Sequence, residues 1–203
     1  MRRWISTKRI QQLKLEELQH CYHRPWNPNQ STEFSFTRFL VPFLNNYRGW
    51  ALFCDGDFLW VDDPSTLSAY CDDRYAVMCV QHDLQPDSLT DIKMDGKKQL
   101  WYRRKNWSSL MLFNCAHPYT RSLTPELIST ASASFLHELD WARDSIGSLP
   151  LEYNFLVGYY RDTNCNVKAY HYTDGVPLYD DYKDCDYSSL WISEYERQQN
   201  ERT

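Results

Sequence analysis

The sequence has no long basic block and no apolar run long enough to cross a membrane. Its net charge is −5 over 203 residues, whereas extensive nucleic-acid binding normally requires a basic face. The longest apolar stretches are short and interrupted, and a membrane-spanning helix needs about 20 apolar residues. No apolar segment of adequate length follows the basic N-terminus, which argues against a signal peptide. We therefore expect a cytoplasmic protein that binds no nucleic acid and has no transmembrane segment.

Paired cysteines are lacking as well. The seven cysteines are an odd number and include no Cys-x-x-Cys pair. Cys54, Cys79 and Cys115 lie within apolar runs, where free thiols behave as small buried side chains. A disulfide scaffold is therefore not expected, and a reducing compartment is. The residues 20–23, His-Cys-Tyr-His, are not expected to bind zinc, because no second ligand pair occurs at suitable spacing.

The chain also lacks internal repeats and any linker that would divide it. With 203 residues, of which 42% are apolar, it is long enough for one domain with its own core. Aromatic residues are abundant, at 16%. Their flat, amphipathic rings suit sugar-binding clefts, although core packing is the commoner role. We expect a single domain over residues 1–203, with a polar, frayed tail at residues 195–203.

Short apolar runs alternate with helical patterns, which predicts an α/β fold with a mainly parallel sheet flanked by helices. The expected strands cover residues 4–10, 50–54, 58–61, 75–81, 111–114 and 166–172. Residues 11–22 form a weak helix or a connector. The expected helices begin at residue 31, with Pro42 kinking or dividing the first of them, and then cover residues 65–70, 124–139 and 151–159. Thr124 is expected to be an N-cap, with Pro125 at the first helical position.

Two acids, Asp55 and Asp57, follow the most apolar of these runs, Trp50–Cys54. A continuous apolar run predicts a strand that is buried on both faces, and ligands of such sheets bind at the carboxyl ends of the strands. Two carboxylates there are costly unless they are paired or bound to a cation. Mn²⁺ or Mg²⁺ takes carboxylate oxygens and can bridge to phosphate. The alternative is an acidic surface turn, but the run before the two acids is too apolar for an exposed edge strand.

Five segments resemble, in the same order, motifs of the GT-A glycosyltransferases of family 8, which include glycogenin and the lipopolysaccharide galactosyltransferases. They cover residues 31–39, 47–67, 106–114, 149–154 and 171–175. The third segment, Asn-Trp-Ser-Ser-Leu-Met-Leu-Phe-Asn, is similar to the family's N-S-G-v-m-l-i-N. The resemblance implies a Rossmann-type GT-A fold. It is strongest to small enzymes of bacteria and their phages, which implies the cytoplasm of a bacterial cell or a phage-infected host.

The resemblance also implies roles for individual residues. Asp57 and His171 would bind the metal, and Asp55 would bind the metal or the metal and the ribose together. Glu152 and Asn154 would bind hydroxyl groups of donor or acceptor, and Asp174 would be a further acid near the metal. The remaining donor-site residues would be Arg38, Lys105, Trp107, Ser108, Ser109 and Asn114. Within this set Arg38 would reach the diphosphate or the sugar, and Trp107 would stack on a sugar.

Three departures from the family pattern are visible. The family opens with a strand and helix that bind the nucleobase, whereas residues 4–10 resemble its second strand, so residues 1–30 correspond to a truncated N-terminal part. The family's late Lys is absent after Gly175, and Lys105 or its two preceding arginines would supply that charge. Tyr153 stands where the family has Gln.

These features predict transfer of a sugar from a nucleoside diphosphate sugar, with uridine as the base, to a hydroxyl acceptor, with retention favoured. If the enzyme is inverting, Glu152 or Asp174 would be the base. The absent first strand motivates an alternative, a catalytically degenerate nucleotide-sugar-binding module. A metal-dependent phosphohydrolase is less favoured, because its later Lys and acidic pair cannot be placed in this sequence.

Overall fold

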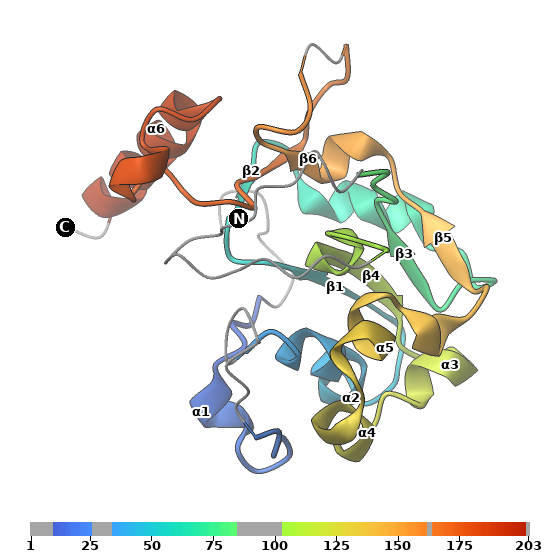
Figure 1. Ribbon diagram of the computed structural model, residues 1–203. Coiled ribbons are helices and arrows are strands. Elements are labelled where there is room, and N and C mark those ends of the chain that lie inside the picture. The colour runs from blue at the N-terminus through green and yellow to red at the C-terminus, as the bar shows by residue number, and fades with distance from the viewer. Residues whose placement is uncertain (1–9, 26–33, 85–102, 162–163, 202–203) are drawn as a thin grey trace.

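The structure is a computed structural model that describes residues 10–25, 34–84, 103–161 and 164–201 (Figure 1). Its larger sheet has four strands in the order β1-β4-β3-β5. These strands are β1 (Trp50–Cys54), β3 (Val77–Cys79), β4 (Leu110–Asn114) and β5 (Ile146–Ser148). β4 is antiparallel to both β1 and β3, whereas β3 and β5 are parallel.

A smaller sheet has the order β2-β7-β6. It consists of β2 (Phe58–Trp60), β6 (Phe155–Leu156) and β7 (Ala169–His171). β7 is antiparallel to β2 and parallel to β6. The α/β class is therefore confirmed, but the expectation of a mainly parallel sheet is wrong, because three of the five pairings between described strands are antiparallel. The alternation of strand and helix patterns in the sequence does not determine which strands become neighbours.

β1 was expected to be buried on both faces, and the structure corrects this. All five of its residues are half-buried, and only β4 pairs with it, so β1 is the outermost strand of the described part of the sheet. The neighbouring β4 is the fully buried strand. Apolar composition therefore did not distinguish the central strand from the outermost described strand, since Trp50–Cys54 is the more apolar of the two runs although it is the less buried.

The helices are short except for the last. The α-helices are α1 (Leu15–Leu18), α2 (Val41–Leu44), α3 (Pro118–Arg121), α4 (Pro125–Thr130), α5 (Ala133–His137) and α6 (Ser188–Asn200). Short 3₁₀ helices cover Thr37–Leu40, Pro64–Tyr70, Trp107–Ser109, Asp140–Ala142, Leu151–Tyr153 and Asp180–Tyr182. Figure 1 shows α2 to α5 together on one side of the larger sheet and α6 at the opposite side of the molecule. No helix in the described ranges combines the length and apolar character that a membrane span requires.

Several local predictions are confirmed by the helix boundaries. Pro42 divides the first helix, since a 3₁₀ turn ends at Leu40 and Pro42 occupies the first turn of α2, where its missing N–H is not needed. Thr124 caps α4 by accepting a hydrogen bond from the backbone N–H of Leu127 at 3.2 Å. The helix expected over 124–139 is divided, because Ser132 starts α5 with its own cap on Phe135.

Other local predictions are wrong or lie outside the described residues. Residues 151–159 form a 3₁₀ turn and then β6 instead of one helix. The tail is helical through Asn200, so its expected fraying is wrong for residues 195–200. Arg197 stabilises this part of α6 by pairing with Glu194 and Glu201. The expected strand at residues 4–10 and the expected helix start at residues 31–33 fall outside the described ranges, apart from Ile10, which is not in a strand.

Candidate active site

Three strands of the larger sheet bring polar residues to the same end of the sheet. Because β1 and β3 both run antiparallel to β4, their carboxyl ends lie beside the amino end of β4. Asp55 follows β1, His82 follows β3 by three residues, and Ser108 and Ser109 precede β4. The backbone N–H of Asp55 donates to the carbonyl oxygen of Ser109 at 2.9 Å. Ligands of α/β sheets bind at the carboxyl ends of strands, so this end of the sheet is the expected ligand site.

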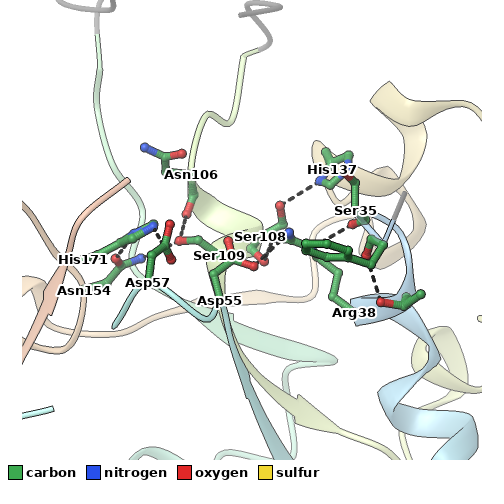
Figure 2. A network of polar contacts seen from close by, with 12 residues as sticks. Ser35, Arg38, Asp55, Asp57, Asn106, Ser108, Ser109, His137, Asn154 and His171 are labelled. Atoms are coloured by element: carbon green, nitrogen blue, oxygen red, sulfur yellow. Dashed lines mark hydrogen bonds and ion pairs between the residues drawn. The ribbon is translucent and has the colours of Figure 1, made fainter. Parts of the chain in front are cut away.

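The Asp55-Gly56-Asp57 turn leads from the larger sheet to the smaller one. Asp57 immediately precedes β2, and the pairing of β2 with β7 sets Phe58 opposite His171. The N–H of Tyr172 donates to the carbonyl oxygen of Asp57 at 3.1 Å. Strand pairing thus brings together residues that are 114 positions apart in the sequence. One ligand atom from each of Asp55, Asp57 and His171 lies within 4.8 Å of the others (Figure 2).

The ring of His171 is fixed on three sides and is only 1% exposed. Phe58 stacks on it, with ring centroids 4.3 Å apart and planes 21° apart. Its Nδ1 lies 2.9 Å from Oδ1 of Asn154, and its Nε2 lies 3.3 Å from Oδ1 of Asp57. These contacts aim Nε2 at the acidic pair.

A chain of hydrogen bonds determines which nitrogen of His171 carries the proton. The hydroxyl of Ser109 donates to the carbonyl oxygen of Asn106 at 2.7 Å, so its oxygen accepts from Nδ2 of Asn154 at 3.0 Å. Asn154 is fully buried, and its amide oxygen, which can only accept, therefore faces Nδ1 of His171. Nδ1 therefore carries a hydrogen, and in the neutral ring the lone pair of Nε2 faces Asp57. A lone pair that faces a carboxylate oxygen at 3.3 Å fits a site with a cation between the two atoms.

Arg38, in the 3₁₀ helix before α2, is bonded to Asp55. Its Nη2 lies 2.8 Å from Oδ1 of Asp55 and its Nη1 lies 3.1 Å from Oδ2, which is the bidentate arrangement. Nη1 also donates to the carbonyl oxygen of Ser108 at 2.9 Å, and Nε donates to that of Ser35 at 2.8 Å. The guanidinium that was predicted to reach the diphosphate thus holds one of the two acids and the segment before β4.

The segment 105–109 is fixed from both sides of the site. The hydroxyl of Ser108 lies 2.9 Å from Nδ1 of His137 in α5, and the indole N–H of Trp107 donates to the carbonyl oxygen of His82 at 2.9 Å. Lys105 is buried, with 5% exposed. Asn106 has a φ of 63°, a left-handed conformation that Asn tolerates better than most residues. Sequence reasoning missed Asn106, although an Asn just before a strand is a signal for such a turn.

Of the other predicted site residues, Asn114 is placed away from the cluster of Asp55, Asp57 and His171, and Glu152 and Asp174 have partners of their own. Asn114 lies at the far end of β4, opposite Trp50, and is four residues, or about 14 Å, from the end near Asp55. The carboxylate of Glu152 lies 3.5 Å from Nζ of Lys168. Asp174 accepts a hydrogen bond from the hydroxyl of Tyr159 at 3.0 Å.

The fold is that of the GT-A glycosyltransferases. The chain matches the apo structure of the bifunctional glycosyltransferase WbbM with a TM-score of 0.57 and 17% identity, over 80% of this chain and 36% of WbbM. It matches the apo form of the glycosyltransferase GlyE of Streptococcus pneumoniae TIGR4 with a TM-score of 0.55 and 13% identity, over 80% and 43% of the two chains. The galactosyltransferase LgtC, in complex with donor and acceptor sugar analogs, matches with a TM-score of 0.53 and 13% identity, over 84% and 69%. The chain thus spans less than half of WbbM and of GlyE.

The sequence matches no protein-family model. It is 48% identical to Protein CDI of Arabidopsis thaliana over 185 residues, which cover 89% of this chain and 71% of that protein. The chain belongs to the same family as Protein CDI. This relative is a plant protein, so the comparison does not support the expected bacterial or phage type, and the assignment to family 8 stays a prediction.

Proposed function

We propose that the protein is a metal-dependent glycosyltransferase that moves a sugar from a uridine diphosphate sugar to a hydroxyl acceptor. The observation that supports the proposal is the cluster of Asp55, Asp57 and His171, which lies at the end of the sheet where a GT-A fold binds its ligand. Two carboxylates and one imidazole are a ligand set for Mn²⁺ or Mg²⁺, and the contact of Nδ1 with Asn154 directs Nε2 of His171 toward the acids for coordination.

When bound, the divalent cation supplies electrostatic stabilisation of the diphosphate leaving group. The chain's own residues hold the ligands in place beforehand. Arg38 fixes both oxygens of Asp55, and Asn154 fixes the ring of His171. Such preorganisation matters because ligands that are already oriented need no rearrangement during the reaction. We further propose that Lys105, Trp107 and Ser108 bind the donor, since their segment adjoins Asp55.

Retention of the anomeric configuration is the stereochemistry that we propose. An inverting enzyme needs a carboxylate base directed at the acceptor hydroxyl. The two carboxylates suggested for that role are engaged by Lys168 and Tyr159, respectively. This engagement supports retention, and NMR analysis of the anomer formed from each active donor tests it.

The proposal is tested by a screen of nucleotide sugars for manganese-dependent release of nucleoside diphosphate. Asp57→Asn should abolish the release, because it removes one charge from the ligand set while preserving the size of the side chain. Asp72→Asn is the matched control, since Asp72 pairs with the exposed Arg74 and lies outside the cluster. Unchanged release in Asp57→Asn, or an equal loss in both variants, would contradict the proposed role of the cluster.

A nucleotide-sugar-binding module without catalysis is the second candidate. It is favoured by the engagement of Glu152 by Lys168 and of Asp174 by Tyr159, which occupies the two carboxylates suggested as a catalytic base. Binding of a nucleotide sugar with Mn²⁺, together with no release of nucleoside diphosphate under any acceptor condition, distinguishes this candidate from the enzyme.

A further inference from the structure

His82 is a buried histidine that the proposed metal site does not use. It follows β3 at the same end of the larger sheet as Asp55, and it is 4% exposed. Its Nδ1 lies 2.8 Å from the hydroxyl oxygen of Tyr160, which follows β6 of the smaller sheet. Its carbonyl oxygen accepts the indole N–H of Trp107 at 2.9 Å. His82 is therefore held at the junction of the two sheets by contacts from both.

The second ring nitrogen of His82, Nε2, has no hydrogen-bond partner among the described residues, although it is buried. Burying a polar atom without a partner is unfavourable, and such atoms in folded proteins require an explanation. The ring of His82 lies at the end of the larger sheet where this fold binds its ligand. A ligand group that forms the missing hydrogen bond accounts for both observations.

The protonation of His82 and Tyr160 indicates which kind of ligand group forms the missing hydrogen bond. Burial, and to a lesser extent the nearby His171, lowers the pKa of His82 to about 3, so its imidazole is neutral. Burial raises the pKa of Tyr160, so its hydroxyl keeps its proton. Nε2 donates if Tyr160 donates to Nδ1, and it accepts if Nδ1 carries the hydrogen. A hydroxyl group satisfies either arrangement, whereas a phosphate oxygen can only accept and an ammonium can only donate.

We propose that Nε2 of His82 binds a hydroxyl group of the sugar being transferred and that Tyr160 is the positioning residue for the ring. This inference rests on the proposed function, because it presupposes a nucleotide sugar whose diphosphate lies at Asp55, Asp57 and His171. The transferred sugar is favoured over the acceptor because it is attached to that diphosphate, and His82 lies within electrostatic range of His171.

The test compares the affinities of UDP and of UDP-sugars, each with Mn²⁺, by calorimetry. UDP-glucose, UDP-galactose and UDP-N-acetylglucosamine are the probes. His82→Leu should leave the affinity for UDP unchanged and lower the ratio of UDP-sugar affinity to UDP affinity about tenfold. His82→Gln, whose amide reaches near the position of Nε2, should restore part of the ratio. Tyr160→Phe, which leaves the ring without its support, should give an intermediate ratio.

An unchanged ratio in His82→Leu would overturn the inference, and so would an equal weakening of UDP and UDP-sugar, which indicates a purely structural role. Circular dichroism and thermal unfolding check that each variant is folded. If His82→Leu does not fold, an unchanged ratio in Tyr160→Phe overturns the inference instead. Absence of manganese-dependent UDP binding by the wild-type protein would count against the proposed function itself, and that result is distinct from an unchanged ratio.

Discussion

The side-chain oxygen of Asn154 lies 2.9 Å from Nδ1 of His171, and this contact determines which ring nitrogen faces Asp57. Both residues are buried. Partners of this kind matter almost as much as the ligands themselves, because they fix the tautomer and the orientation of the ring. Asn154 was predicted to bind sugar hydroxyls, whereas in the structure its side chain contacts His171, the proposed metal ligand.

Replacing Asn154 by Leu should weaken Mn²⁺ binding by about 10- to 100-fold, because His171 loses the partner that orients it. Titration calorimetry measures the affinity. Asn154→Asp is the matched control, since it keeps an oxygen for His171 and loses only the donation to Ser109, so its loss should be smaller. Wild-type affinity in Asn154→Leu would show that the contact does not position the ring.

Mn²⁺ should raise the thermal stability of the wild-type protein and raise that of His171→Ala much less. At a concentration of about 100 times Kd, a ligand stabilises the folded state by about 2.7 kcal/mol. His171 contributes one of the three proposed ligand atoms, so its removal should eliminate most of this gain. Addition of EDTA should reverse the shift in the wild-type protein. A shift of equal size in His171→Ala would exclude this residue as a ligand.

Arg38→Met should lower the free energy of unfolding by about 1–3 kcal/mol, because it leaves the carboxylate of Asp55 without its charged partner. Saturating Mn²⁺ should recover part of this loss, since the cation then neutralises the same carboxylate. Urea unfolding with and without Mn²⁺ measures both quantities. Arg38→Lys keeps the charge but not the bidentate geometry, so its loss should be intermediate. A loss that is identical with and without Mn²⁺ would argue against a cation site at Asp55.

Thr124→Ala should destabilise the protein by about 1 kcal/mol and lower Tm by about 2–4 °C, because α4 loses its N-cap hydrogen bond to Leu127. Activity at 25 °C should not change, since the cap lies in the helical layer. Thr130→Ala is the control. The hydroxyl of Thr130 donates to the carbonyl oxygen of Glu126 on the exposed side of the same helix, and its loss should have less than half the effect. Equal effects would contradict the capping role.

Stability should decrease with acidification in a way that depends on His82. Burial lowers the pKa of His82 from its ordinary 6.5 to about 3, so below pH 6.5 the unfolded chain binds a proton that the folded protein excludes. The stabilising contribution is complete above pH 6.5 and is lost as the pH falls toward 3. Between pH 6 and 4, His82→Gln should therefore lose stability less steeply than the wild type, by on the order of 1 kcal/mol per pH unit. Parallel stability curves would contradict the shift.

The sequence was sufficient to locate five of the strands, because their apolar runs are bounded by turn residues. It did not predict β5, whose three residues Ile146–Ser148 include a single large apolar side chain. A Cβ at Gly147 would lie 2.1 Å from the sulfur of Met78, so a larger residue there would require the Met78 side chain to move. Nor did it predict strand order, which depends on contacts between distant segments.

The candidate site was predictable only in part. The two acids were found from their position after an apolar strand, whereas His171 came from a family resemblance, since no local pattern connects residues that only the pairing of β2 with β7 brings together. The partners of these ligands were missed. Nothing in the sequence around Arg38 or Asn154 indicates that they contact Asp55 and His171, respectively.

The turn that carries both acids is also the chain's passage from the larger sheet to the smaller one. Asp55 follows β1 of the larger sheet, and His171 lies in β7 of the smaller sheet. A metal ion bound by these side chains would therefore link the two sheets to each other. The consequence is a stiffer molecule in the loaded state, in which amide hydrogen exchange slows more along β2 and β7 than along helix α6, which has no buried residue and packs on the smaller sheet through Trp191.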